Sequence, residues 1–337
     1  MKAVAYQNSL AIDQVNSLVD VSLPDPVASG HDLLVEVKAI SVNPVDTKVR
    51  MRAAPPAGEW KVLGWDASGI VRAVGPDVSL FKPGDRVWYA GSIDRAGSNS
   101  ELQLVDERIA SRMPANLDFA NAAALPLTSV TAWEMLFDRL AIDPDKKSDG
   151  KSLLIIGAAG GVGSIMTQLA RKLTGLTVIG TASRPETKAW VSKLGAHHVI
   201  DHSLLLTDEL KRIGIPHPNY IVSLTHTDQH FTQIVEAIAP QGKFGLIDDP
   251  KPIDITLLKR KSVSLHWELM FTRSLFNTDD MIAQHHILAR VADLVEKGVI
   301  TTTVHEHFGK INAANLKRAH ALLESGKASG KIVLEGF

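Results

Sequence analysis

A glycine-rich segment, IIGAAGGVGSIMTQLAR at residues 155–171, has the composition of a turn that binds a dinucleotide. It begins in an apolar run typical of a strand and continues into a segment of helical character. In this context the backbone turns tightly, and amide N–H groups at the start of the helix can bind a pyrophosphate. The alternative is a structural turn that binds nothing. We predict phosphate contacts from Gly157, Ala158, Ala159, Gly160, Gly161, Val162 and Gly163.

The end of the next predicted strand indicates which dinucleotide binds. An Asp or Glu there, about 20 residues after the glycines, would bind the ribose hydroxyls of NAD. The segment TVIGTASRPETK has no acid from Thr177 to Arg184, and Ser183, Arg184 and Lys188 could instead bind a 2′-phosphate. The predicted cofactor is therefore NADPH, unless Arg184 and Lys188 are ordinary solvated residues at a helix start. Further predicted cofactor contacts are His202, Leu224, Leu246 and Lys331.

Strands and helices alternate through the middle of the chain. The predicted strands cover residues 152–157, 176–182, 197–201, 219–225, 243–248 and 262–269, and the helices between them cover 162–173, 185–195 and 230–240. Repeated βα units with apolar strands indicate a parallel, doubly wound sheet of the α/β class. We place this dinucleotide-binding domain at residues 125–268.

The two ends of the chain have a different pattern. From Met1 to about Ala110, short alternating apolar runs are separated by Pro and Gly, which indicates antiparallel strands in a barrel or sandwich. A long helix is predicted over residues 121–140 in spite of Pro126. The C-terminal part adds predicted helices at 281–298 and 312–326 and strands at 299–308 and 331–337. We expect residues 1–124 and 269–337 to form one substrate domain.

Composition excludes several classes of protein. The 337 residues, of which 45% are hydrophobic, suffice for two packed domains. The 36 Lys and Arg residues balance 37 Asp and Glu residues, so no basic surface for nucleic acid is expected. The absence of cysteine excludes disulfides, thiolate zinc sites and cysteine nucleophiles. Because no signal peptide or membrane-spanning apolar run is visible, we predict a soluble cytoplasmic enzyme without a membrane partner.

Motifs along the whole chain carry a family resemblance. They are AISVNPVDTKVR (39–50), GWDASGIVRAVG (64–75), FKPGDRV (81–87), AALPLTSVTAW (123–133) and GAAGGVG (157–163). With them the chain resembles the medium-chain dehydrogenase/reductase superfamily, and within it the zinc-free quinone oxidoreductase, or zeta-crystallin-like, branch. A closer likeness to bacterial proteins called zinc-type alcohol dehydrogenase-like is suggested by WYAGSIDRAGSN (88–99) and HWELMFTRS (266–274).

This resemblance implies a domain plan. It implies a GroES-like β-barrel substrate domain, a Rossmann domain and a nicotinamide lying in the cleft between them. It also implies a homodimer formed through edge strands of the Rossmann sheets. The apolar strand at residues 262–269 is the candidate edge, since a strand edge needs a partner.

The resemblance also permits a test for a metal. The positions that hold the catalytic zinc in zinc-dependent relatives correspond here to Asn43, Trp65 and Leu127, and Trp and Leu have no usable lone pair. The four-cysteine structural lobe is missing as well, since a short loop at residues 88–101 passes its location. The 13 histidines form no HExxH pattern, so we predict that no metal is bound.

Chemistry without a metal favours reduction. Oxidation of an unactivated alcohol would lack the ion that stabilises an alkoxide, whereas a quinone or enone is already electrophilic and needs only hydrogen-bond donors. We therefore expect hydride transfer from NADPH to a quinone or activated carbonyl compound. The alternatives are an alkenal or enone double-bond reductase, a zinc-type alcohol dehydrogenase, and a non-catalytic NADPH-binding protein.

Particular side chains are assigned to this chemistry. The family comparison indicates Asn43 and Thr128 as polar contacts near the nicotinamide or substrate, with Asp46 fixing the segment of Asn43. Asp46 has either a direct catalytic role or, in an Asx–Pro turn formed by SVNPVD, the role of capping a short helix. An apolar wall for a flat substrate is predicted from Trp65, Tyr89, Trp267, Met270 and Phe271, although ordinary core packing explains the same residues.

Overall fold

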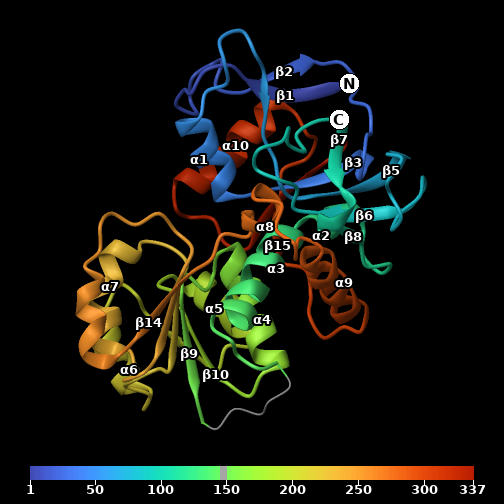
Figure 1. Ribbon diagram of the computed structural model, residues 1–337. Helices are drawn as coiled ribbons and strands as arrows, with labels where there is room; N and C mark the ends of the chain where they lie inside the picture. Colours follow the sequence, from blue (N-terminus) through green and yellow to red (C-terminus); the bar gives the residue numbers. More distant parts are fainter. Residues whose placement is uncertain (145–149) are drawn as a thin grey trace. The chain divides into compact units, whose positions relative to one another are not determined.

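The computed structural model describes residues 1–144 and 150–337, which form two compact units. The first unit consists of Met1–Val130 and Phe271–Phe337, and the second unit of Thr131–Met270. Figure 1 labels the helices and strands of both. Each unit has its own sheets and its own apolar core, so each is described by itself.

A parallel sheet forms the centre of the second unit, which confirms the predicted α/β class. Its strand order is β11-β10-β9-β12-β13-β14, and every pair of neighbours is parallel. The strands are β9 (Ser152–Ile156), β10 (Thr177–Thr181), β11 (His198–Ile200), β12 (Tyr220–Ser223), β13 (Lys243–Leu246) and β14 (Ser264–Trp267). The order runs outward in both directions from β9, so the carboxyl ends of β9, β10 and β12 are adjacent. Ligands bind at such a point in doubly wound sheets.

Helices cover both faces of this sheet. They are α4 (Gly161–Leu173), α5 (Pro185–Lys193), α6 (Leu206–Arg212) and α7 (Thr227–Ala237). Figure 1 shows α4 and α5 on one face and α6 and α7 on the other. A buried apolar cluster packs the sheet against α6 and α7, and it includes Leu154, Ile179, Leu210, Ile234 and Phe244.

Mainly antiparallel sheets form the first unit. A three-stranded sheet has the order β2-β1-β4, and a larger one has the order β15-β16-β3-β5-β6-β8, with β7 also pairing with β3. The strands are β1 (Lys2–Tyr6), β2 (Val19–Ser22), β3 (Asp32–Val42), β4 (Lys61–Val62), β5 (Ala67–Val74), β6 (Arg86–Tyr89), β7 (Leu102–Asp106), β8 (Ala110–Arg112), β15 (Val304–His307) and β16 (Lys331–Glu335). The antiparallel pairing of β16 with β3 brings the C-terminal strand beside residues 39–42.

The other helices are mostly short. In the first unit they are α1 (Pro44–Arg52), η1 (Glu107–Ile109), α2 (Phe119–Ala123), α8 (Thr272–Leu275), α9 (Ala283–Glu296) and α10 (Ala313–Glu324). The helix α3 (Pro126–Trp133) crosses from the first unit into the second. The second unit also has a π-helical turn, η2 (Glu134–Arg139), and a 3₁₀ segment, η3 (Ile255–Lys261).

Several predicted elements differ from the structure in extent. The helix predicted over 121–140 is divided into α2, α3 and η2. Pro126 separates α2 from α3, because it has no N–H to donate and its ring blocks the preceding turn. The strand predicted over 299–308 is only β15, and the strand predicted over 262–269 is only β14. In each of these segments, the apolar pattern of the sequence extends beyond the residues that form the helix or strand.

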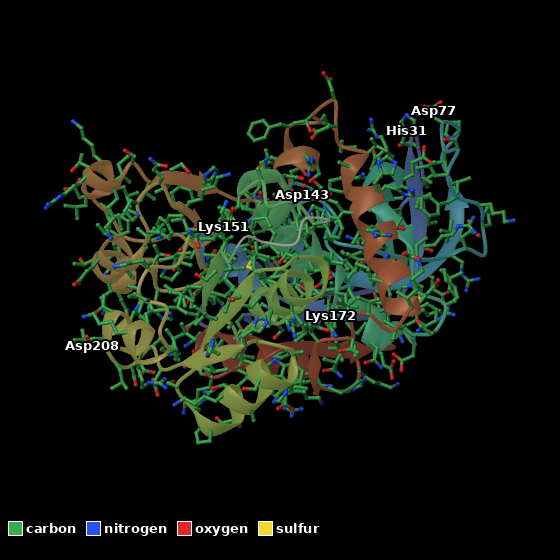
Figure 2. The ribbon with its side chains drawn as sticks, turned by 90° about the horizontal axis from the view of Figure 1, so that it is seen from below. His31, Asp77, Asp143, Lys151, Lys172 and Asp208 are labelled. Atoms are coloured by element: carbon green, nitrogen blue, oxygen red, sulfur yellow. The ribbon has the colours of Figure 1, made fainter. Side chains whose placement is uncertain are left out.

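Charged side chains lie mostly at the surface. Figure 2 shows Asp77 at the margin of the first unit and Asp208 at the margin of the second. Asp208 pairs with Lys211 one helical turn away at 3.4 Å, an exposed pair of little energetic weight. Within residues 1–144 and 150–337, no helix is both long enough and apolar enough to cross a membrane.

Candidate active site

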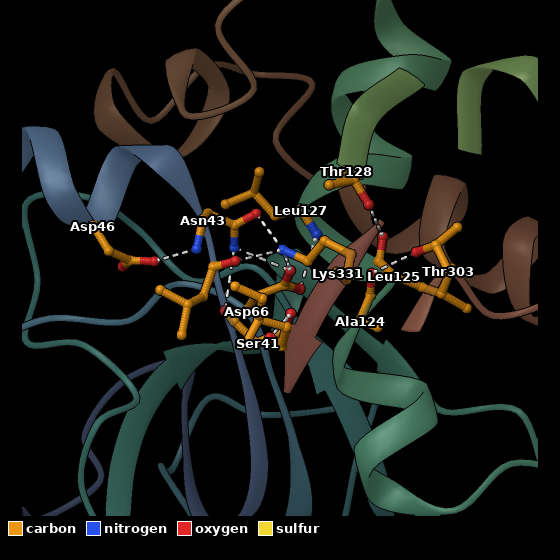
Figure 3. A network of polar contacts seen from close by, with 12 residues as sticks. Ser41, Asn43, Asp46, Asp66, Ala124, Leu125, Leu127, Thr128, Thr303 and Lys331 are labelled. Atoms are coloured by element: carbon orange, nitrogen blue, oxygen red, sulfur yellow. Dashed lines mark hydrogen bonds and ion pairs between the residues drawn. The ribbon is translucent and has the colours of Figure 1, made fainter. Parts of the chain in front are cut away.

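Asn43 lies where β3 passes into α1, and its side chain is buried in a polar cluster (Figure 3). Its Nδ2 donates to the carbonyl oxygen of Ser41 at 3.3 Å and to Oδ2 of Asp66 at 3.1 Å. Its Oδ1 accepts a hydrogen bond from Nζ of Lys331. Both amide hydrogens are therefore engaged inside the first unit, and Asn43 is held in one orientation.

Asp66 and Lys331 are the charged pair at the centre of this cluster. Nζ of Lys331 lies 3.0 Å from Oδ2 of Asp66 and also donates to the carbonyl oxygen of Val42 at 3.1 Å. The amide of Leu127 donates to Oδ1 of Asp66 at 3.1 Å. Burial raises the pKa of Asp66, and the Lys331 ammonium and these hydrogen bonds oppose the rise. A carboxylate so far from water is retained only because its partners are in place.

Asp46 holds the first turn of α1. Its Oδ2 accepts a hydrogen bond from the backbone amide of Asn43 at 2.6 Å, so it caps the helix, which is one of the two roles left open by the sequence. Burial raises the pKa of Asp46 to about 7, and the nearby charge of Asp66 adds to the rise. The Asn43 and Gly64 amides and the Lys331 ammonium oppose it. Asp46 therefore positions the turn before α1, and its carboxyl group has a pKa above that of an ordinary aspartate.

Thr128 lies in the first turn of α3 and is almost completely buried. Its Oγ1 donates to the carbonyl oxygen of Leu125 at 3.2 Å, and Thr303 donates similarly to Ala124 at 3.3 Å (Figure 3). These bonds satisfy carbonyl groups at the junction of α2 and α3. Asp66, Ser41 and Thr303 were not among the residues predicted for the site, and Lys331 was predicted only as a cofactor contact. An acid directly after Trp65 in an apolar segment was the only signal for Asp66.

Trp65 is completely buried beside Phe271. Their rings meet edge to face, with centroids 6.2 Å apart and planes at 76°. The indole Nε1 of Trp65 has no hydrogen-bond partner among the residues that the structure describes. Gly64 before it has φ of +104°, and a Cβ there would lie 2.6 Å from Oγ of Ser98 and from Oδ1 of Asn99. The turn at Gly64 therefore requires glycine.

The other predicted wall residues differ in burial and in the unit to which they belong. Tyr89 is buried in β6 opposite Ala67, its hydroxyl has no partner within the described residues, and burial raises its pKa. Met270 is buried in the second unit. Trp267, at the end of the edge strand β14, is 54% exposed, so it is a surface residue of the second unit.

The glycine-rich turn follows β9 and has the shape that phosphate binding needs. Gly157 has φ of +84°, which favours glycine, and Gly160 precedes the first residue of α4. A Cβ on Gly163 would lie 2.4 Å from the carbonyl oxygen of Gly157, so helix and turn can pack this closely only without a side chain. A Cβ on Gly160 would meet nothing nearer than 3.5 Å, so the protein leaves space above this turn. The backbone thus fits a bound pyrophosphate.

The predicted 2′-phosphate residues cluster where β10 ends. Ser183 and Arg184 follow β10, and Lys188 lies in the first turn of α5. Nε of Arg184 pairs with Glu186 at 2.9 Å, and Nζ of Lys188 pairs with Asp201 at 2.7 Å. The sequence did not reveal that each cation has a carboxylate partner. Other cofactor candidates of this unit also follow or end strands, namely His202 after β11, Leu224 after β12 and Leu246 in β13.

The residues at the expected metal positions do not fit zinc. The side chains of Asn43, Trp65 and Leu127 offer an amide, an indole and an alkyl group, whereas zinc sites are built from thiolate, imidazole and carboxylate. Asn43 is also bonded on both sides of its amide. Within residues 1–144 and 150–337, no group of three or more His, Asp or Glu side chains is arranged to hold a metal ion.

Comparison with known proteins identifies the family. A family model described as a zinc-binding dehydrogenase matches residues 194–334, and one described as an alcohol dehydrogenase GroES-like domain matches residues 29–114. The zinc-type alcohol dehydrogenase-like protein of Staphylococcus epidermidis (strain ATCC 12228 / FDA PCI 1200) is 41% identical over 336 residues, with 99% of each chain covered.

Solved structures give the same result. The crystal structure of a candidate zinc-dependent alcohol dehydrogenase from Rhizobium etli CFN 42 matches with a TM-score of 0.96 and 58% identity, covering 100% of this chain and 98% of that one. The Escherichia coli quinone oxidoreductase complexed with NADPH matches with a TM-score of 0.85 and 25% identity over 100% of both chains. Fold and site therefore define a two-domain oxidoreductase with a GroES-like unit and a parallel-sheet Rossmann unit. The chain belongs to the medium-chain dehydrogenase/reductase superfamily, as the sequence motifs predicted.

Proposed function

We propose that this protein is a zinc-independent reductase that transfers hydride from NADPH to a quinone or another activated carbonyl compound. The observation that carries the proposal is the cluster of Asn43, Asp66 and Lys331, whose polar groups satisfy one another, and Asn43 stands at a position that the resemblance assigns to a metal ligand in zinc-dependent relatives. Such a site offers no Lewis acid, so it suits acceptors that are electrophilic by themselves.

The second unit supports a nicotinamide cofactor. Amide groups at the start of α4 would hold the pyrophosphate, and Ser183, Arg184 and Lys188 would bind the 2′-phosphate. The E. coli quinone oxidoreductase of similar fold was solved with NADPH, which also supports this choice. When bound, the cofactor supplies the hydride.

In the first unit, we assign positioning roles to Asn43, Asp46 and Thr128. The hydrogens of Asn43 Nδ2 and Thr128 Oγ1 are donated to protein acceptors, so either group would reach a substrate only by exchanging a partner. The role of these side chains is to keep the turn before α1 and the junction before α3 rigid. Trp65 and Phe271 are both buried, so their edge-to-face packing would support this cluster from the interior of the first unit.

A substrate panel with metal analysis tests the proposal. Purified protein is mixed with NADPH, and in parallel with NADH, and offered naphthoquinones, 2-alkenals and simple aldehydes while cofactor oxidation is followed by absorbance. Quinone turnover with NADPH preferred, and zinc well below one ion per chain in the same sample, is the expected result.

Other results of this panel select other functions. Turnover of 2-alkenals but not quinones identifies a double-bond reductase. Stoichiometric zinc in protein purified without added metal identifies an alcohol dehydrogenase and refutes our interpretation of Trp65. Tight NADPH binding with no turnover identifies a binding protein.

We also propose a homodimer formed through the edge strand β14. Within the described residues β14 pairs only with β13, and Trp267 and Leu269 beside it are 54% and 51% exposed. Light scattering of the purified protein should give the mass of two chains, and a Trp267→Arg variant should shift it toward one. A single-chain mass for the parent protein refutes this assembly.

A further inference from the structure

Arg50, in the last turn of α1, has a completely buried side chain. Its guanidinium group donates to the carbonyl oxygen of Leu10 and pairs with the carboxylate of Glu324, the last residue of α10. The hydroxyl of Tyr6 donates to the carbonyl oxygen of Ala53, directly after α1, at 2.7 Å. The carboxyl end of α1 is therefore fixed to α10, the helix against which it packs (Figure 1).

His320 lies on the buried face of α10, one turn before Glu324. Neither nitrogen of its ring has a hydrogen-bond partner among the residues that the structure describes, and Nε of Arg50 has none within the same residues. Burial, together with the charge of Arg50, lowers the pKa of His320 to about 3. The ring is therefore uncharged at neutral pH and does not repel Arg50.

Arg50, His320 and Glu324, which we call the α1–α10 clamp, are an unfavourable choice for stability alone. Burial removes water from a guanidinium group whose Nε is not bonded, and unmet polar groups in the interior destabilise the folded state. Replacing a buried ion pair by apolar residues of similar volume is often neutral or stabilising. Apolar side chains would pack the two helices at least as well. What the clamp adds is one fixed position of α1 against α10.

Both helices lead directly to the candidate active site. α1 begins after Asn43, and residues 325–330 connect the end of α10 to Lys331, the first residue of β16. Nζ of Lys331 in turn donates to Oδ1 of Asn43. Two polar contacts thus close this part of the chain into a ring, Asn43 with Lys331 at one end and Arg50 with Glu324 at the other. Because the connection over 325–330 is short, a shift of α10 against α1 would displace the Lys331 ammonium from Asn43.

We propose that Arg50 and Glu324 are positioning residues of the reductase, which fix the Lys331 ammonium against Asn43 and so hold the turn before α1 in place during hydride transfer. The proposal rests on the function proposed above and adds residues that act through Asn43 and Lys331, not on the substrate itself. An ion pair with a merely structural role would change stability when it is replaced. A positioning pair changes the state of Asn43 and the turnover rate instead.

A variant that replaces the clamp with uncharged side chains separates positioning from stability. Arg50→Met, His320→Leu and Glu324→Gln are combined in the full chain, and Arg52→Met, at an exposed residue of the same helical turn, is the control. The proteins are compared by urea denaturation and by steady-state kinetics with NADPH and a naphthoquinone. The side-chain amide signal of Asn43 is recorded by NMR in protein labelled with nitrogen-15 asparagine, and it is identified by its loss in Asn43→Ser.

We expect the clamp variant to unfold at a urea concentration equal to or above that of the parent protein. Its kcat should fall about ten-fold, while KM for either substrate changes by less than about two-fold. The Asn43 amide signal should move and its hydrogens should exchange faster with solvent, because Oδ1 loses a fixed partner. Arg52→Met should match the parent protein in every measurement.

An Asn43 signal that keeps its parent position and exchange rate overturns the inference, and so does a moved signal with the kcat of the parent. If the clamp variant does not fold, Glu324→Gln alone is the second variant, since Glu324 is 24% exposed. It should move the same signal by a smaller amount, and an unmoved signal again overturns the inference. A parent protein that reduces no quinone refutes the proposed function, and the NMR signal then decides by itself whether the clamp positions Asn43.

Discussion

Nζ of Lys331 lies 3.0 Å from Oδ2 of Asp66, and both side chains are almost completely buried. The two residues come from β16 and from the segment before β5, and they hold Asn43 between them. Removing one member of such a pair leaves an uncompensated charge in the protein interior. The stability of the folded protein should therefore depend on both members of the pair.

Lys331→Met should lower the free energy of unfolding by about 3–5 kcal/mol, because Asp66 would keep a buried charge without its cation. Urea denaturation of the full chain measures the change. Lys310→Met, which alters an exposed lysine, is the control and should change stability by less than about 0.5 kcal/mol. Adding Asp66→Asn to Lys331→Met should recover part of the loss. Equal effects at positions 331 and 310 would contradict the structure.

Asp46→Asn should change how stability depends on pH. The folded-state pKa of Asp46 is about 7, above its ordinary value, so the folded protein binds more protons than the unfolded chain and loses stability as the pH rises from about 4 to 7. The slope from this group is at most about 1.4 kcal/mol per pH unit. Asparagine keeps the acceptor for the Asn43 amide but does not titrate, so the slope should flatten in denaturation curves across this range. Asp13→Asn, an exposed control, should retain the parent slope.

Gly64→Ala should destabilise the first unit by about 2–3 kcal/mol, because it adds a clash with Ser98 and Asn99 to an unfavourable φ. Gly58→Ala is a matched control: its φ of +85° is also positive, but a Cβ there meets nothing within 4 Å. We expect that variant to cost only about 1 kcal/mol. Denaturation midpoints of the two proteins should therefore differ, and identical midpoints would show that Ser98 and Asn99 move aside without cost.

Gly160→Ala should leave stability within about 1 kcal/mol of the parent but weaken NADPH binding at least about ten-fold. The added methyl has space in the protein, with its nearest neighbour at 3.5 Å, yet it stands where the pyrophosphate approaches. Gly163→Ala should instead lower stability, since its methyl would lie 2.4 Å from a backbone oxygen. Fluorescence titration with NADPH and thermal unfolding separate the two effects. Undiminished NADPH affinity in Gly160→Ala would place the cofactor elsewhere.

Local patterns in the sequence were sufficient to predict the α/β fold class. An apolar run, a glycine-rich turn and a helical pattern follow one another at residues 152–173, and they predicted β9 and α4. This prediction was possible because apolar periodicity and glycine placement depend only on residues close together in the chain. The parallel sheet followed from repetition of such units. The family resemblance also led to the prediction that Asn43, Trp65 and Leu127 stand where zinc-dependent relatives carry metal ligands. Where the apolar pattern continued beyond the end of an element, as over residues 121–140, the sequence predicted helical structure but not the residues at which each helix begins and ends.

Only the tertiary structure decided which polar groups meet. Lys331 is 288 residues from Asn43 in the chain, and the antiparallel pairing of β16 with β3 alone brings them together. The pairing of Lys188 with Asp201 and the meeting of His202 with His230 likewise depend on segments that follow different strands. The physical reason is that periodicity fixes which face of an element is buried, whereas strand order fixes which residues face one another. Charge balance at both sites is therefore a property of the folded chain.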